Sequence, residues 1–140
     1  MFKQLTPAVA VSPQIEVADV ATAAAQGFVC IVNNRPDGES PDQPAGGAIR
    51  AAAEAAGLRY VAIPVDARGF SQPMVAAMVD ALAAGKTLAF CRSGTRSTNL
   101  WSLASASQGG SIAEITATAA AAGYDVSGLA GAMAQLGGKA

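Results

Sequence analysis

The segment CRSGTR, at residues 91–96, places a nucleophile and an anion-binding side chain on one short loop. Cys91 ends an apolar run, and Arg96 follows it five positions later. Cysteine attacks as the thiolate, and the arginine guanidinium offers a planar fork of N–H donors that fits two oxygens of an oxyanion. The spacing therefore predicts an anion-binding loop around a reactive cysteine, with Cys91 and Arg96 as catalytic residues.

The other residues of the loop are small, polar or basic, which suits binding of an anion by backbone amides. Gly94 has no side chain where amides must crowd together or where φ is positive. A helix that starts just after the loop would add unpaired N–H groups and a partial positive charge, which stabilise both an anion and a thiolate. We therefore predict an anion-binding loop that includes Arg92, Ser93, Gly94, Thr95 and Ser97. The alternative is an inert buried cysteine before an ordinary helix cap, but the glycine and arginine at these offsets argue against it.

The overall composition restricts the chemistry and the partners. The chain has no histidine, which removes Ser-His-Asp chemistry, Cys-His pairing and zinc sites with histidine ligands. Two cysteines are too few for a disulfide framework, and Cys30, inside an apolar run, is expected to pack in the core. The net charge is −1 without a basic cluster, so neither nucleic acid nor a membrane surface is expected as a partner. We expect no metal and no cofactor and, without a recognisable signal peptide or membrane span, a cytoplasmic location.

Strand-like and helix-like patterns alternate along the chain. Apolar runs predict strands at residues 8–11, 28–33, 59–65 and 86–91. Helices are predicted at residues 12–27, 45–57, 73–85, 111–123 and 127–138, and from about 95 to the Gly109-Gly110 break. Ser12 is the predicted N-cap of the first helix. Helices between strands imply right-handed crossovers, so the expected fold is a three-layer α/β domain over residues 1–140, with a parallel sheet of about four strands flanked by helices.

Two further polar segments follow strand ends and are expected at the same edge of the sheet as Cys91. Asp66 comes directly after the strand at 59–65, so its carboxyl could protonate a leaving oxygen and later activate water. The alternative role for Asp66 is a turn cap or an ordinary loop acid. The possible substrate rim after the strand at 28–33 consists of Asn34, Arg35 and Asp37, with Glu39 nearby. These residues could contact the substrate, or they could simply hold a loop rich in proline and glycine.

The motifs also resemble known families. The segment CRSGTRS resembles the active loop of rhodaneses, whereas protein-tyrosine and dual-specificity phosphatases have one more residue between cysteine and arginine. The whole chain, with GFVCIVNNRPDGESPDQP, RYVAIPV and AFCRSGTRSTNLW, resembles a bacterial family named after the phosphatase-like domain of β-lactamase-hydrolase-like proteins. This resemblance implies a phosphatase-like fold and hydrolysis of a phosphate monoester through a phosphocysteine at Cys91. Arg96 would bind the phosphoryl oxygens, and Asp66 would be the acid.

Two other functions stay open. A rhodanese-like sulfurtransferase would carry a persulfide on Cys91; the short loop favours it, and Phe90 stands where the phosphatases have a histidine. A non-catalytic module that binds oxyanions is the second alternative. The helices expected after residue 110 favour the phosphatase, because a rhodanese usually returns to a strand there. The expected substrate is a small anion or a phosphorylated side chain, and the oligomeric state is left open.

Overall fold

A computed structural model, which describes residues 2–140, has one mixed sheet with the strand order β1-β2-β5-β3-β4. Its four parallel strands are β2 (Val9–Ser12), β3 (Cys30–Asn33), β4 (Arg59–Ala62) and β5 (Thr87–Phe90). Each overlaps one of the apolar runs, so the predicted parallel sheet is confirmed. A fifth strand, β1 (Lys3–Thr6), pairs antiparallel with β2 at the edge of the sheet. The sequence did not indicate β1, because KQLT is short and Leu5 is its single apolar residue.

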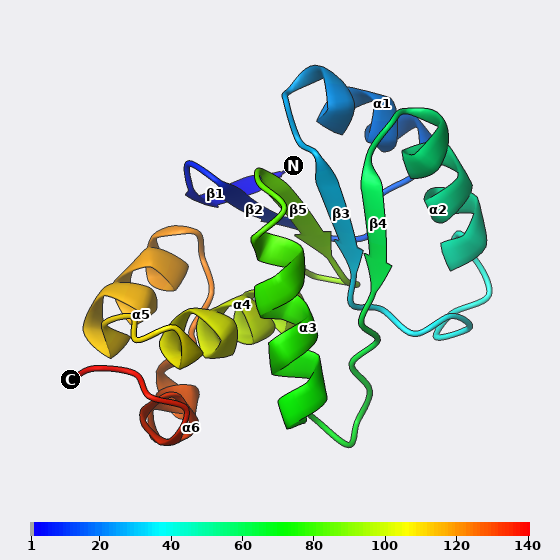
Figure 1. Ribbon diagram of the computed structural model, residues 1–140. Helices are drawn as coiled ribbons and strands as arrows, with labels where there is room; N and C mark the ends of the chain where they lie inside the picture. The colour runs from blue at the N-terminus through cyan, green and yellow to red at the C-terminus, as the bar shows by residue number, and fades with distance from the viewer. Residues whose placement is uncertain (1) are drawn as a thin grey trace.

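Helices cover both faces of this sheet, which confirms the predicted three layers (Figure 1). One face carries α1 (Val17–Ala25) and α2 (Gly46–Ala55). The other carries α3 (Gln72–Leu82), α4 (Thr95–Ser107), α5 (Ile112–Ala121) and α6 (Ala130–Gln135), with the short 3₁₀ helix η1 (Ser127–Leu129) before α6. Alternate strand residues enter the two cores: Ile31 packs toward α1 and α2, whereas Val32 packs toward the larger group.

The start of the first helix differs from the prediction, and Ser12 is not its N-cap. Ser12 is the last residue of β2, where it pairs with Phe90, and its buried hydroxyl donates to the carbonyl of Pro13. Ser12 belongs to the sheet, and the helix begins only at Val17. Glu16 is the N-cap, and its N–H donates to the Asp19 carboxylate over 2.8 Å.

The strand at 59–65 is also shorter than predicted. It ends at Ala62, two residues before Pro64, which has no N–H to donate to a neighbouring strand. Past the end of β4, the chain is still held to the segment after β3 by a backbone hydrogen bond. The N–H of Val65 donates to the carbonyl of Asn34 over 3.0 Å. This contact keeps the segment before Asp66 beside the end of β3.

Residues 111–140 contribute helices and no strand to the central sheet, as expected. Their only β-type pairing is an isolated bridge between Ser111 and Lys139. None of the helices described for residues 2–140 is long and apolar enough to cross a membrane. The four parallel strands run in one direction, so their carboxyl ends meet at one edge, where parallel sheets bind ligands. Cys91 follows β5 at that edge.

Candidate active site

Cys91 lies at the centre of this edge, directly after β5, which pairs with both β2 and β3. Its N–H donates to the carbonyl of Ser12 over 3.3 Å, and the residue is fully buried. The chain then turns into α4 through Gly94, whose φ of +92° is a conformation that favours glycine. The N–H of Gly94 donates to Cys91 Sγ over 3.1 Å. The loop therefore curls around the sulfur.

The loop has unpaired backbone donors at the start of α4. The N–H groups of Arg92, Ser93, Arg96 and Ser97 have no hydrogen-bond acceptor within residues 2–140. The N–H of Thr95 has only a long contact of 3.4 Å to the Ser93 hydroxyl. Unpaired N–H groups in the first turn of a helix carry partial positive charge and bind anions. The loop can therefore receive an oxyanion without breaking a backbone hydrogen bond.

Arg96 has part of its guanidinium free for a ligand. Its Nη1 donates to Glu39 Oε2 over 2.7 Å and to the carbonyl of Val65 over 2.9 Å, and its Nη2 donates to Glu39 Oε1 over 2.9 Å. These bonds use three of the five N–H donors of a guanidinium. The remaining two, on Nε and Nη2, share one edge of the group and have no oxygen acceptor among residues 2–140. Such an edge fits two oxygens of one oxyanion.

Glu39 holds this guanidinium in place. Its carboxylate also accepts a 3.0 Å hydrogen bond from Nε of Arg35. The hydrogen bond from Arg96 is the main reason that the pKa of Glu39 falls to about 2, and Arg35 lowers it further against the effect of burial. The pKa of Arg96 is raised first by Glu39 and also by the charge of Cys91, so the guanidinium is within electrostatic reach of the sulfur. Two guanidiniums around one carboxylate leave an excess of positive charge beside the loop.

The three predicted rim residues are occupied by contacts within the protein. Arg35 is buried and donates to Gln14, Glu39 and Ser40. The buried side chain of Asn34 links two elements, because its Nδ2 donates to the carbonyl of Ile63 and its Oδ1 accepts from the Ser97 hydroxyl.

Asp37 binds the start of α2, where its Oδ1 accepts from the N–H of Gly46 over 2.8 Å. These contacts correspond to the alternative in which the segment holds its own loop. The contribution of the segment to the site is indirect, through Arg35 and Glu39.

Asp66 follows Val65, the residue whose carbonyl accepts from Arg96, but its carboxylate faces Arg68. Nη2 of Arg68 donates to Oδ2 over 2.9 Å, and the N–H of Arg68 donates to Oδ1 over 2.9 Å. These hydrogen bonds lower the pKa of Asp66 and favour its ionised form. In this conformation Asp66 is the turn cap that the sequence allowed as an alternative. A proton-donating role requires it to leave Arg68.

Tyr124 also contacts the cysteine loop, which the sequence does not indicate. Tyr124 follows α5, and its hydroxyl donates to the carbonyl of Ser93 in the cysteine loop over 3.0 Å. No local pattern indicated this contact, because 31 residues separate the two partners. Cys30 packs in the core as predicted, together with Met78 and Trp101.

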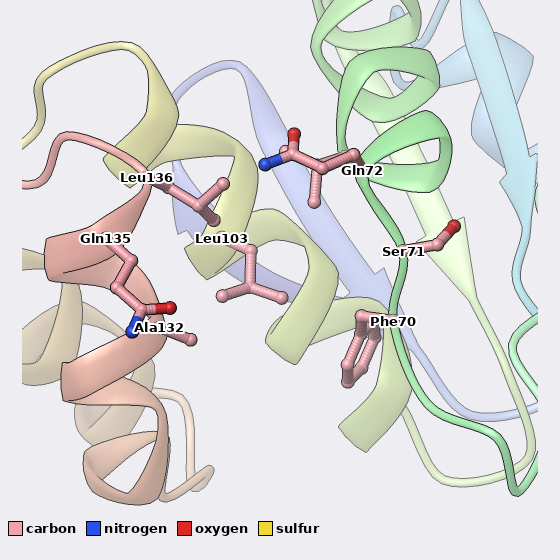
Figure 2. Close-up of a pocket in the computed structure, with 8 residues that line it drawn as sticks. Phe70, Ser71, Gln72, Leu103, Ala132, Gln135 and Leu136 are labelled. Atoms are coloured by element: carbon pink, nitrogen blue, oxygen red, sulfur yellow. The ribbon is translucent and has the colours of Figure 1, made fainter.

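An apolar pocket lies away from the loop, between the start of α3, α4 and α6 (Figure 2). Its volume is about 200 Å³, and it is lined by Phe70, Ser71, Gln72, Val75, Leu103, Ala132, Gln135 and Leu136. The lining contains no ionisable side chain and no residue of the cysteine loop. The pocket therefore offers no cationic side chain to an oxyanion, whereas the cysteine loop has Arg96 and backbone donors at the start of α4.

Solved structures with the same fold include proteins described as phosphatases. A protein of Neisseria meningitidis described as a candidate phosphatase superimposes with a TM-score of 0.80 and 31% identity, over 95% of this chain and 96% of that one. A candidate dual-specificity phosphatase of mouse, crystallised with zinc tungstate, has a TM-score of 0.65 at 18% identity, over 97% of this chain and 86% of that one. The predicted protein-tyrosine and dual-specificity phosphatase fold is confirmed, and the chain is a phosphatase-like domain by fold.

Residues 1–108 match the family described as the phosphatase-like domain of β-lactamase-hydrolase-like proteins, and the chain belongs to this family. A β-lactamase-hydrolase-like protein of Agrobacterium fabrum is 40% identical over 107 residues, or 71% of this chain and 23% of that protein. One from Xylella fastidiosa is 38% identical over 96 residues, or 67% of this chain and 22% of that protein. The matched part is thus less than a quarter of either relative.

Proposed function

We propose that this domain hydrolyses phosphate monoesters through a phosphocysteine on Cys91. The observation that carries the proposal is a set of donors beside the sulfur that have no oxygen acceptor within residues 2–140: four backbone N–H groups and two N–H groups of Arg96. A phosphoryl group has three terminal oxygens that gain negative charge during transfer. Fixed donors around those oxygens stabilise the transition state more than the ground state.

The proposed reaction has two steps. The Cys91 thiolate attacks phosphorus, the bond from phosphorus to the ester oxygen breaks, and the leaving oxygen takes a proton from Asp66. A water molecule then attacks the phosphocysteine, gives its proton to Asp66, and releases phosphate and the thiolate. Arg96 binds two phosphoryl oxygens through Nε and Nη2 in both steps. For Asp66 to act, it must exchange its contact with Arg68 for one with the substrate.

A rhodanese-like sulfur transfer is the second candidate, and one observation favours it. Only four residues separate Cys91 from Arg96, as in the rhodanese loop, whereas the phosphatase loop has one more. A smaller loop suits a persulfide, in which the terminal sulfur of a donor is transferred to the thiolate. The sheet without a strand after residue 110 favours the phosphatase instead.

One pair of assays separates these candidates. Hydrolysis of p-nitrophenyl phosphate and formation of thiocyanate from thiosulfate and cyanide are measured on wild type and on Cys91→Ser. The proposal expects phosphate release by wild type and none by Cys91→Ser. Thiocyanate that depends on Cys91, without phosphate release, would assign the site to sulfur transfer. Phosphate binding without either reaction would leave a module that binds oxyanions.

A further inference from the structure

Tyr124 is a nearly buried side chain that joins the hydrophobic core to the cysteine loop. The residue is 9% exposed and packs in the core cluster of α3, α4, α5 and α6. It is positioned by the end of α5, where the N–H of Tyr124 donates to the carbonyl of Ala119 over 2.9 Å. Its hydroxyl donates to the carbonyl of Ser93 over 3.0 Å. A phenol in the core therefore binds one peptide group of the active loop.

That peptide group also contacts the sulfur. The carbonyl of Ser93 and the N–H of Gly94 belong to the same peptide bond, and no peptide bond in residues 2–140 is cis. In a planar trans peptide the C=O and the N–H point in opposite directions. Tyr124 binds the C=O, and the N–H of Gly94 donates to Cys91 Sγ over 3.1 Å. Fixing one end of the peptide therefore fixes the direction of the other.

The glycine at position 94 allows this arrangement. A Cβ on Gly94 would overlap the hydroxyl oxygen of Tyr124 and lie 2.9 Å from its Cζ, which is closer than real Cβ contacts. The φ of +92° also disfavours any side chain there. The absence of a side chain at Gly94 thus allows both the close contact with Tyr124 and the turn of the loop.

We propose that Tyr124 is a positioning residue for the nucleophile: it orients the Ser93–Gly94 peptide so that the N–H of Gly94 stabilises the Cys91 thiolate. A hydrogen bond to the charged form of a group favours that form. The effect on the sulfur is independent of the reaction, and only its consequence for turnover depends on the proposed phosphatase function. The other ionisable groups close to this arrangement are Arg96, beside Cys91, and Lys3, whose Nζ lies 5.0 Å from the centre of the Tyr124 ring.

The test compares Tyr124→Phe with Tyr60→Phe. Both remove one hydroxyl from a partly or fully buried tyrosine with a hydrogen-bond partner, but the Tyr60 hydroxyl contacts Asn33 instead of the loop. Ultraviolet absorbance of the thiolate is followed between about pH 5 and pH 9. The same titration of each protein with Cys91→Ser added gives the background. Tyr124 itself contributes little in this range, because burial raises its pKa, and the charge of Cys91 raises it further.

For Tyr124→Phe we expect the thiolate to form at higher pH than in wild type. On the acid side of the titration, the fraction of Cys91 present as thiolate should be about 3- to 10-fold lower. We expect kcat for p-nitrophenyl phosphate to fall by a similar factor with little change in KM, because Arg96 still binds the phosphoryl group. Tyr60→Phe should titrate like wild type. A shifted titration in a protein without phosphatase activity would keep the positioning role and reject the proposed reaction.

Three results would overturn the proposal. The first is an unchanged thiolate titration in a folded Tyr124→Phe protein, even if its melting temperature falls, because the residue would then only support the core. The second is an equal shift in Tyr60→Phe. The third is a higher KM for p-nitrophenyl phosphate in Tyr124→Phe with an unchanged thiolate titration, which would assign Tyr124 to substrate binding.

Discussion

Arg96 and Glu39, which are 57 positions apart in the sequence, form a two-point ion pair at the edge of the sheet. Nη1 donates to Oε2 over 2.7 Å, and Nη2 donates to Oε1 over 2.9 Å. Both side chains are largely covered, with 24% of Arg96 and 28% of Glu39 exposed. The pair leaves one edge of the guanidinium free, so Glu39 decides which edge of Arg96 is available to a ligand.

Replacing Glu39 by glutamine should weaken phosphate binding by about 10-fold. An amide has one acceptor oxygen, and its NH₂ group faces an N–H of Arg96, so the guanidinium loses its fixed orientation. The measurement is the dissociation constant for inorganic phosphate by calorimetry. Glu54→Gln is the matched control, because Glu54 forms an exposed pair with Arg50. Equal affinity in Glu39→Gln and wild type would show that Glu39 does not orient Arg96.

The same carboxylate should make the stability of the domain depend on pH. The pKa of Glu39 falls from 4.5 to about 2, chiefly through the hydrogen bond from Arg96. A carboxyl whose pKa is lower in the folded state stabilises the fold above its unfolded pKa, and this contribution disappears as the pH falls toward the folded pKa. The stability difference between wild type and Glu39→Gln should therefore be largest above about pH 5 and shrink toward about pH 2. Urea unfolding across this range measures it, and a constant difference would contradict the assignment.

Substitutions of Asp66 and Arg68 test whether Asp66 is the general acid of the proposed reaction. Asp66→Asn should lower kcat by roughly 10²- to 10⁴-fold if Asp66 protonates the leaving oxygen, with little change in KM. Arg68→Ala should have a different effect. Arg68 holds the pKa of Asp66 below its ordinary value, so its removal raises that pKa and extends the protonated form to higher pH.

The alkaline limb of the kcat profile should therefore move to higher pH in Arg68→Ala. The profile is measured with an ester whose leaving oxygen needs a proton, such as an alkyl phosphate. If Asp66→Asn turns over as fast as wild type, Asp66 is only the cap of its turn.

Local sequence patterns were sufficient to predict most of the sheet and the position of the cysteine loop. Buried parallel strands are continuous apolar runs, so β2, β3, β4 and β5 could be predicted, and the carboxyl end of β5 placed Cys91. The edge strand β1 could not, because its side chains are partly exposed and its pairing alone makes it a strand.

The long-range polar contacts of the site were not predictable in the same way. The pairing of Glu39 with Arg96 and of Tyr124 with Ser93 depends on which loops the fold brings together. Asp37 and Asp66 were recognised as polar residues after strand ends. Asp37 accepts from Gly46, and Asp66 accepts from Arg68. These partners depend on the backbone conformation of each loop, which the residue types alone do not specify.

Trapping the covalent intermediate tests most directly whether Cys91 is the nucleophile. Wild type is mixed with p-nitrophenyl phosphate, quenched rapidly in acid and digested, and the peptide that contains Cys91 is analysed by mass spectrometry. We expect a phosphoryl group on Cys91 in wild type and an unmodified peptide in Cys91→Ser treated in the same way. Steady phosphate release with no phosphoryl group on Cys91, or with the group on another residue, would contradict it.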